Sequence, residues 1–115
     1  YSSFTYSDLQ VKDGAGEVTV SFRLKNTGKR NGDEVAQVYV RIPDTGGIVP
    51  LKELKGFRRV PLKSGERRRV EIKLNKEQLR YWDVEKGQFV VPRGAFDIMV
   101  GASSKDIRLQ TVIDL

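Results

Sequence analysis

The sequence predicts an all-β fold, an antiparallel β-sandwich of about seven strands. Short segments in which apolar and polar residues alternate recur along the chain, a pattern typical of strands with one face on a core and the other in water. Residues that favour turns, mainly Gly, Asn, Asp and Ser, separate these segments about every 10 to 15 residues, the spacing of a sandwich or barrel. A chain of 115 residues is long enough for one domain, residues 1–115, whose core needs neither disulfides nor metal.

The first expected strand, within residues 4–11, changes the parity of its apolar side chains half-way. Two apolar residues share one parity and the next two share the other: Phe4 and Tyr6, then Leu9 and Val11. A β-bulge near residues 7–8 would insert one extra residue and reconcile the two halves. A strand that moves from one sheet to the other would have the same effect.

The later segments keep a two-residue period, so each predicts a strand with one buried face. Apolar rows of this kind occur within residues 18–24, 36–40, 70–74, 96–100 and 107–113. We expect nine residues of these rows to form the core: Val20, Phe22, Val38, Val40, Ile72, Leu74, Phe96, Ile98 and Leu109.

Residues 51–74 show the pattern most regularly, as two strands joined by a tight polar turn at residues 63–66. A single helical turn is expected directly after them. Asn75 can cap its start, and Glu77 lies where a carboxylate is favoured by the helix dipole.

The composition excludes several classes of active site. The chain has no Cys and no His, which removes disulfides, thiol nucleophiles, Cys-ligated zinc and the usual general base near neutral pH. We therefore predict no cofactor, no metal site and no catalytic residue in this chain.

The charge pattern favours a solvated surface over a nucleic-acid site. The net charge is +6, but 31% of the residues are charged, with both signs spread along the chain. Basic runs at residues 58–59 and 67–69 resemble a nucleic-acid patch, but Glu66 and Glu71 nearby favour ion pairs across strands on a wet face. No nucleic-acid partner is predicted.

No membrane partner is predicted either. No apolar run approaches the roughly 20 residues that span a bilayer, and no signal peptide opens the chain. The chain begins with Tyr1 rather than Met. We expect a piece of a longer polypeptide, with its compartment left open.

Several motifs carry a resemblance to a known family. They are GDEVAQVYV at residues 32–40, KELKGFRRV at 52–60, the pair Trp82-Asp83, and the segment 94–101. In order and spacing they resemble the fibronectin type III-like domain at the C-terminus of family 3 glycoside hydrolases, the β-glucosidase and β-xylosidase family. The resemblance covers essentially the whole chain. This sequence departs from the family pattern at Ser64, where proline is common.

The resemblance implies an immunoglobulin/fibronectin type III-like sandwich that is not itself catalytic. In this family the catalytic carboxylates lie on other domains of the polypeptide. The domain is expected to pack on those catalytic domains, to stabilise them and in some members to flank the substrate entrance. The alternative function is an autonomous module that binds carbohydrate or another polymer.

Two groups of residues are candidates for contacts with partners. Tyr39, Tyr81 and Trp82 could stack on sugar rings; the favoured interpretation is that Trp82 covers one end of the core while Asp83 ties down a loop. Residues 48–50, the apolar tip Ile48, Val49 and Pro50, are expected to contact another domain or to fold back over their own sheet.

Two pairs of carboxylates are candidates for the acid and base of a glycosidase: Asp33 with Glu34, and Asp83 with Glu85. Each pair lies in or beside a predicted turn, where carboxylates commonly cap backbone N–H groups. The sequence therefore favours a structural role for both pairs.

Overall fold

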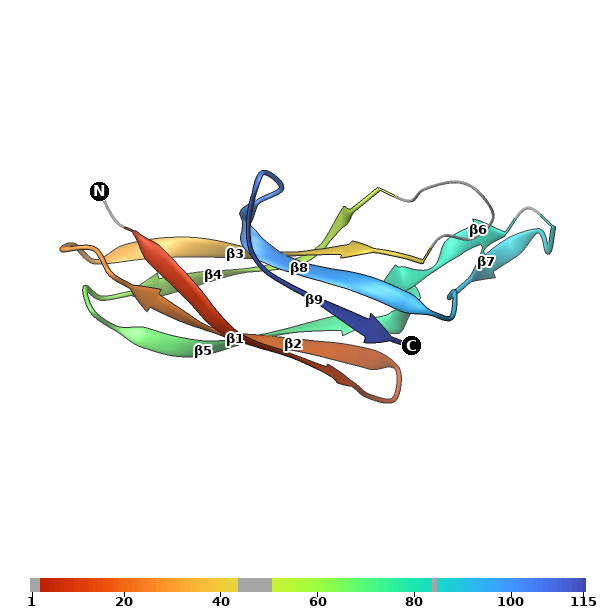
Figure 1. Cartoon of the computed structure of the whole chain (residues 1–115), viewed down its shortest axis with the longest axis horizontal. Helices are drawn as coiled ribbons and strands as arrows, with labels where there is room; N and C mark the ends of the chain where they lie inside the picture. Colours follow the sequence, from red (N-terminus) through yellow and green to blue (C-terminus); the bar gives the residue numbers. More distant parts are fainter. Residues whose placement is uncertain (1–2, 44–50, 84) are drawn as a thin grey trace.

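The computed structural model describes residues 3–43, 51–83 and 85–115. Within these residues the chain forms nine strands and one short 3₁₀ helix (Figure 1). In chain order they are β1 (Phe4–Asp13), β2 (Glu17–Asn26), β3 (Gly32–Arg41), β4 (Glu53–Leu62), β5 (Arg67–Asn75), η1 (Lys76–Leu79), β6 (Tyr81–Asp83), β7 (Gln88–Val90), β8 (Ala95–Ser103) and β9 (Asp106–Asp114).

Seven of these strands form two antiparallel sheets that face each other as the layers of a sandwich (Figure 1). One sheet has the order β1-β2-β5 and the other has the order β4-β3-β8-β9. Strands β1 and β9 meet along one edge of the sandwich, and β4 and β5 meet along the other. The predicted all-β sandwich of about seven strands is confirmed.

The remaining two strands, β6 and β7, pair only with each other. They form a hairpin that projects at one end of the molecule (Figure 1). The sequence did not predict this hairpin, because strands of three residues are too short to show a two-residue period.

Consecutive strands β4 and β5 lie in opposite sheets, so the turn between them carries the chain from one layer to the other. The expected ion pairs on the wet surface are present, but the two basic runs lie in different sheets and one of the acidic partners is Asp33 rather than Glu71. Arg59 pairs with Asp33 on its neighbour β3. Arg68 pairs with Glu66 beside the turn, 3.4 Å away.

A β-bulge produces the parity change in β1. This is one of the two explanations that the sequence predicted. The pairing with β2 shifts register between Ser7 and Gln10. Asp8 has φ +54° there, a left-handed conformation that a non-glycine residue seldom adopts. Arg23 on the adjacent strand lies 3.3 Å from the Asp8 carboxylate and holds it at the surface.

The core lies between the two layers. Eight of the nine predicted core residues are buried there: Val20, Phe22, Val38, Val40, Ile72, Leu74, Phe96 and Ile98. The ninth, Leu109, is partly exposed and packs against the core from the edge strand β9. Large apolar side chains from the two sheets fill the space between the layers and exclude water from it. Burial of their surface therefore makes the largest favourable contribution to the free energy of folding.

The predicted helical turn is also confirmed. The Asn75 side chain accepts a hydrogen bond from the backbone N–H of Glu77, and the Gln78 side chain accepts one from the backbone N–H of Asn75. These reciprocal bonds form a capping box. The turn brings Leu79 into the core, where it closes the end of the sandwich.

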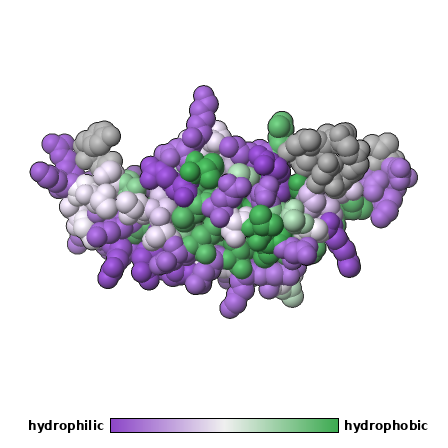
Figure 2. All heavy atoms as spheres, in the orientation of Figure 1, coloured by the Kyte–Doolittle hydropathy of each residue, from purple (hydrophilic) through white to green (hydrophobic). Residues whose placement is uncertain are grey.

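The surface is largely hydrophilic, and apolar atoms gather along the middle of the face shown in Figure 2. Partly buried residues of β1 and β9 also pack against the core, among them Leu9, Val11 and Ile113. No helix in the described part of the chain is long and apolar enough to cross a membrane.

Candidate functional site

The β6–β7 hairpin presents an aromatic surface to solvent. Trp82 is 52% exposed and Phe89 is 54% exposed. Their rings meet edge to face with centroids 5.1 Å apart, and the Arg80 guanidinium lies 4.6 Å from the centre of the Phe89 ring. Edge-to-face and cation–π contacts of this kind fix the orientation of exposed rings.

A surface pocket of about 300 Å³ lies between this hairpin and the beginning of β4. Aromatic, aliphatic and charged side chains line it: Leu51, Glu53, Lys55, Arg80, Tyr81 and Trp82. Tyr81 and Trp82, two of the three predicted stacking residues, are thus brought together at one pocket. An apolar wall with a few charged groups is a common arrangement in ligand sites.

Trp82 does not cover the end of the core, contrary to the favoured interpretation of the sequence. Its ring is half exposed, and Leu79 occupies the core end instead. The other part of that interpretation is confirmed, because the Asp83 carboxylate accepts hydrogen bonds from the backbone N–H groups of Glu85 and Lys86 at 3.0 and 3.2 Å.

Tyr39 lies on the outer face of β3, on the predicted parity, but it is not an exposed platform. Only 8% of the residue is accessible to solvent. Its hydroxyl donates to the Gln37 side chain, and the Lys52 ammonium lies 5.9 Å from the ring centre. The outward parity of Tyr39 therefore does not make it an exposed stacking residue.

Three of the four carboxylates considered as catalytic pairs, Asp33, Glu34 and Asp83, are engaged in contacts within the domain. Asp33 and Glu34 are successive residues of β3, so their side chains point to opposite faces of the sheet. Asp33 pairs with Arg59, and Glu34 accepts a hydrogen bond from the Tyr6 hydroxyl. No cluster of three or more His, Cys, Asp or Glu side chains suited to a metal occurs among the described residues.

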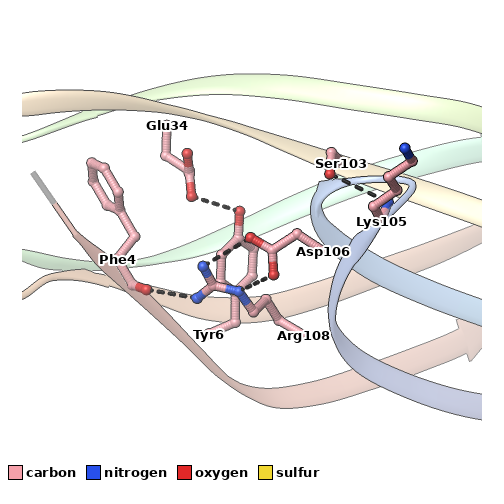
Figure 3. A network of polar contacts seen from close by, with 7 residues as sticks. All are labelled: Phe4, Tyr6, Glu34, Ser103, Lys105, Asp106 and Arg108. Carbon is pink, nitrogen blue, oxygen red and sulfur yellow. Dashed lines mark hydrogen bonds and ion pairs between the residues drawn. The ribbon is translucent and has the colours of Figure 1, made fainter.

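A polar cluster that sequence reasoning missed joins the first and last strands (Figure 3). The Arg108 guanidinium donates to both carboxylate oxygens of Asp106, at 2.6 and 3.0 Å, and to the backbone carbonyl of Phe4, at 2.9 Å. Tyr6 lies beside this guanidinium, whose central carbon is 5.5 Å from the ring centre, and donates to Glu34 at 3.0 Å. The cluster thus connects β1 in one sheet with β3 and β9 in the other.

The charges of this cluster stabilise one another. The hydrogen bond from Arg108 lowers the pKa of Asp106, and the same bond raises the pKa of Arg108. Burial, followed by the charge of Glu34, raises the pKa of Tyr6 well above its usual value of about 10. Each acceptor in Figure 3 has a donor within the protein, an arrangement that suits a structural tie better than a reactive centre.

The predicted inter-domain contact at Ile48, Val49 and Pro50 lies outside the described residues, so it stays a prediction.

The chain is similar to known proteins over nearly its whole length. The profile of the fibronectin type III-like domain family matches residues 34–104. The probable β-glucosidase L of Aspergillus fumigatus is 45% identical over 94% of this chain and 17% of its own length. The probable β-glucosidase M of the same species is 36% identical over 95% of this chain and 16% of its own length.

Solved structures show the same relation. β-Glucosidase 3B from Thermotoga neapolitana, in complex with α-D-glucose, superposes with a TM-score of 0.90 at 35% identity. The GH3 β-glucosidase of Bifidobacterium adolescentis superposes with a TM-score of 0.91 at 34% identity. These superpositions cover 99% and 100% of this chain, but only 16% and 17% of those chains.

Proposed function

Because the chain belongs to the fibronectin type III-like domain family, we propose that residues 1–115 form one non-catalytic accessory domain of a longer glycoside hydrolase of the β-glucosidase type. In that enzyme the domain packs on the catalytic domains of the same polypeptide and stabilises them. One observation carries the proposal: a probable β-glucosidase matches 94% of this chain with only 17% of its own length.

The geometry of the carboxylates supports the non-catalytic assignment. Hydrolysis of a glycoside uses two carboxyl groups about 5 to 10 Å apart that flank the scissile bond. Asp33 and Glu34 cannot flank one bond, because they lie on opposite faces of β3 and are held by Arg59 and Tyr6. Asp83 is held by the backbone of its own turn.

The fold suits a rigid supporting part. Both sheets are antiparallel, the core between them is closed, and the polar cluster ties the first strand to the last. A rigid domain loses little conformational entropy when it docks. Its contacts with a neighbouring domain therefore stabilise the whole enzyme with little opposing cost.

The test begins with the coding sequence on either side of this chain, which we expect to encode the catalytic domains and their two carboxylates. The second step removes residues 1–115 from the full polypeptide and compares melting temperatures. We expect the shortened enzyme to melt several degrees lower, while the 115-residue chain alone leaves an aryl β-glucoside intact. Turnover by the purified chain alone, or a gene without a catalytic region, would overturn the proposal.

A second candidate function is carbohydrate binding at the hairpin, which could place the domain beside the substrate entrance. The observation that favours it is the pair of half-exposed rings, Trp82 and Phe89, of which Trp82 lines a surface pocket together with Tyr81. Aromatic faces of this kind pack against the apolar face of a sugar ring. Titration of the full enzyme and its Trp82→Ala variant with cello- and xylo-oligosaccharides, followed by tryptophan fluorescence and calorimetry, tests it. Equal heats for both proteins would dismiss this candidate.

A further inference from the structure

The outer faces of the two sheets differ in chemistry. On the three-stranded sheet every outward residue of β2 and β5 is polar or charged: Glu17, Thr19, Ser21, Arg23 and Lys25, then Arg67, Arg69, Glu71, Lys73 and Asn75. Hydrophilic side chains accordingly cover the lower, β2–β5 side of the molecule in Figure 2. This face is built for water.

The outer face of the four-stranded sheet carries the ion pairs Asp33–Arg59 and Arg41–Asp97, but it also carries exposed apolar side chains. Phe57 on β4 is 66% exposed, and Leu54 on the same strand is 48% exposed. Leu54 is in register with Tyr39 of β3, which is in register with Met99 of β8. Tyr39 and Met99 are themselves buried, so an apolar row runs across the outer face of three strands.

The hairpin extends this apolar region beyond the sheet. Leu54 and Phe89 line one surface pocket, and Leu51 and Trp82 line the next. Val35 on β3 is in register with Arg59 of β4, so six of the exposed apolar residues in the described part of the chain lie along the β4 side of the molecule. We refer to them as the β4 surface: Val35, Leu51, Leu54, Phe57, Trp82 and Phe89.

We propose that the β4 surface is the face on which the catalytic part of the same polypeptide docks, and that the outer face of the three-stranded sheet stays in water. The inference rests on the proposed function and adds the orientation of the domain. Exposed aromatic and aliphatic side chains that group on one side of a protein mark an interaction surface, because their contact with water is unfavourable and a partner removes it.

The occupant follows from the length of the relatives. Matches that cover 99% to 100% of this chain leave more than four-fifths of the solved β-glucosidases outside it, since they cover 16% and 17% of those chains. A large folded body joined covalently to the domain is present at a high effective concentration, which favours it over a second copy of the chain.

The charged residues around the β4 surface carry both signs. Lys55 and Arg80 line both of its pockets, Glu53 lines one of them and Glu77 lines the other. Lys55 and Glu53 already pair with each other, 3.0 Å apart. An apolar centre with a border of both signs fits a patch on the catalytic part whose border also carries both signs.

Thiol reactivity in the full-length polypeptide tests the orientation, because this chain contains no Cys of its own. Phe57→Cys places a thiol on the outer face of edge strand β4. Glu71→Cys places a matched thiol on the outer face of edge strand β5. Labelling of each site by a maleimide is followed by mass spectrometry of the peptide that contains it. We expect the thiol at position 57 to react at least about ten-fold more slowly than the thiol at position 71.

Each other outcome is decisive. Slow labelling at position 71 with fast labelling at position 57 would overturn the orientation and leave the accessory function standing. Fast labelling at both positions in a polypeptide that contains catalytic domains would overturn the orientation and the packing together. Slow labelling at both would overturn the assignment of a single docking face. Protection at position 57 that disappears on dilution, with a change in mass by light scattering, would identify a second copy as the occupant and overturn the choice of partner.

Discussion

The Tyr6 hydroxyl donates a hydrogen bond to the Glu34 carboxylate at 3.0 Å, and this bond joins β1 in one sheet to β3 in the other. The Tyr6 ring also stacks on Phe22 in the core, with centroids 5.7 Å apart. One side chain thus contributes to the core and to the polar tie between the layers.

Removing this hydroxyl should weaken the tie and spare the packing. We expect Tyr6→Phe to lower the free energy of unfolding by about 1–2 kcal/mol, because Glu34 loses its donor while the ring keeps its contact with Phe22. Equilibrium urea unfolding is measured for the wild type, for Tyr6→Phe, for Glu34→Ala and for the double variant. The four free energies of unfolding give the coupling energy between the two residues. A coupling energy near zero would show that the bond contributes nothing to stability.

The same residue should make the domain sensitive to alkali. Burial and then the charge of Glu34 raise the pKa of Tyr6 in the folded state. In the unfolded chain the phenol ionises at about pH 10. The stability that depends on neutral Tyr6 is therefore present below about pH 10 and is lost as the pH rises above it. Melting temperatures measured between about pH 8 and 11 should fall more steeply for the wild type than for Tyr6→Phe; parallel curves would contradict the assignment.

Alternation along the chain was sufficient to predict the layers of this fold and most of its core. Val20 and Phe22 on β2 and Ile72 and Leu74 on β5 are buried because a period of two places every second side chain on one face, whatever the partner strand. The parity change near Asp8 was also visible, since an inserted residue reverses the parity of all later positions in the strand, but the sequence left a bulge and a change of sheet as alternatives.

Relations between distant segments could not be predicted in this way. Periodicity does not say which sheet a strand joins, so the separation of β4 from β5 was not predicted. Tyr39 has the parity of an exposed residue but is buried through contacts with side chains of its own and other segments. Arg108 reaches the carbonyl of Phe4, 104 positions away, and no local signal in either segment indicates that contact.

Two glycines should respond differently to the addition of a methyl group. At Gly101 a Cβ would overlap the backbone carbonyl of Asp106, which is fixed by strand pairing. At Gly56 a Cβ would come within 2.9 Å of two methyl groups, Cγ2 of Ile72 and Cδ2 of Leu74, and side chains adjust more readily than a paired backbone. We expect Gly101→Ala to cost about 2–3 kcal/mol and Gly56→Ala about 1 kcal/mol. Urea unfolding of both variants gives the comparison, and a reversed order would show that the β8–β9 turn adjusts more easily than the core.

Asn26 holds together the end of the sandwich where β2, β4 and the β4–β5 turn meet. Asn26 is fully buried. Its side-chain N–H₂ group donates to the carbonyls of Arg30 and Leu62 at 2.9 and 3.1 Å, and its side-chain oxygen accepts from the Gly28 N–H at 2.9 Å. The N–H₂ group and the oxygen of this buried side chain thus both have hydrogen-bond partners. Such bonds matter for stability chiefly because a buried donor or acceptor that loses its partner destabilises the folded state.

Asn26→Asp should therefore be far more damaging than its small change in shape suggests. The new carboxylate oxygen would face the carbonyls of Arg30 and Leu62 without a proton to donate, and we expect a loss of about 3 kcal/mol or more at neutral pH. Protonation restores one donor, so the folded state raises the pKa of this carboxyl, and the loss should shrink as the pH falls toward about 4. Asn31→Asp is the matched control, because its side-chain oxygen accepts from the Ser64 N–H at 3.0 Å and an aspartate keeps that bond. Urea unfolding at both pH values decides the matter: equal losses for the two variants, or a loss for Asn26→Asp that does not depend on pH, would mean that the two carbonyls find other donors.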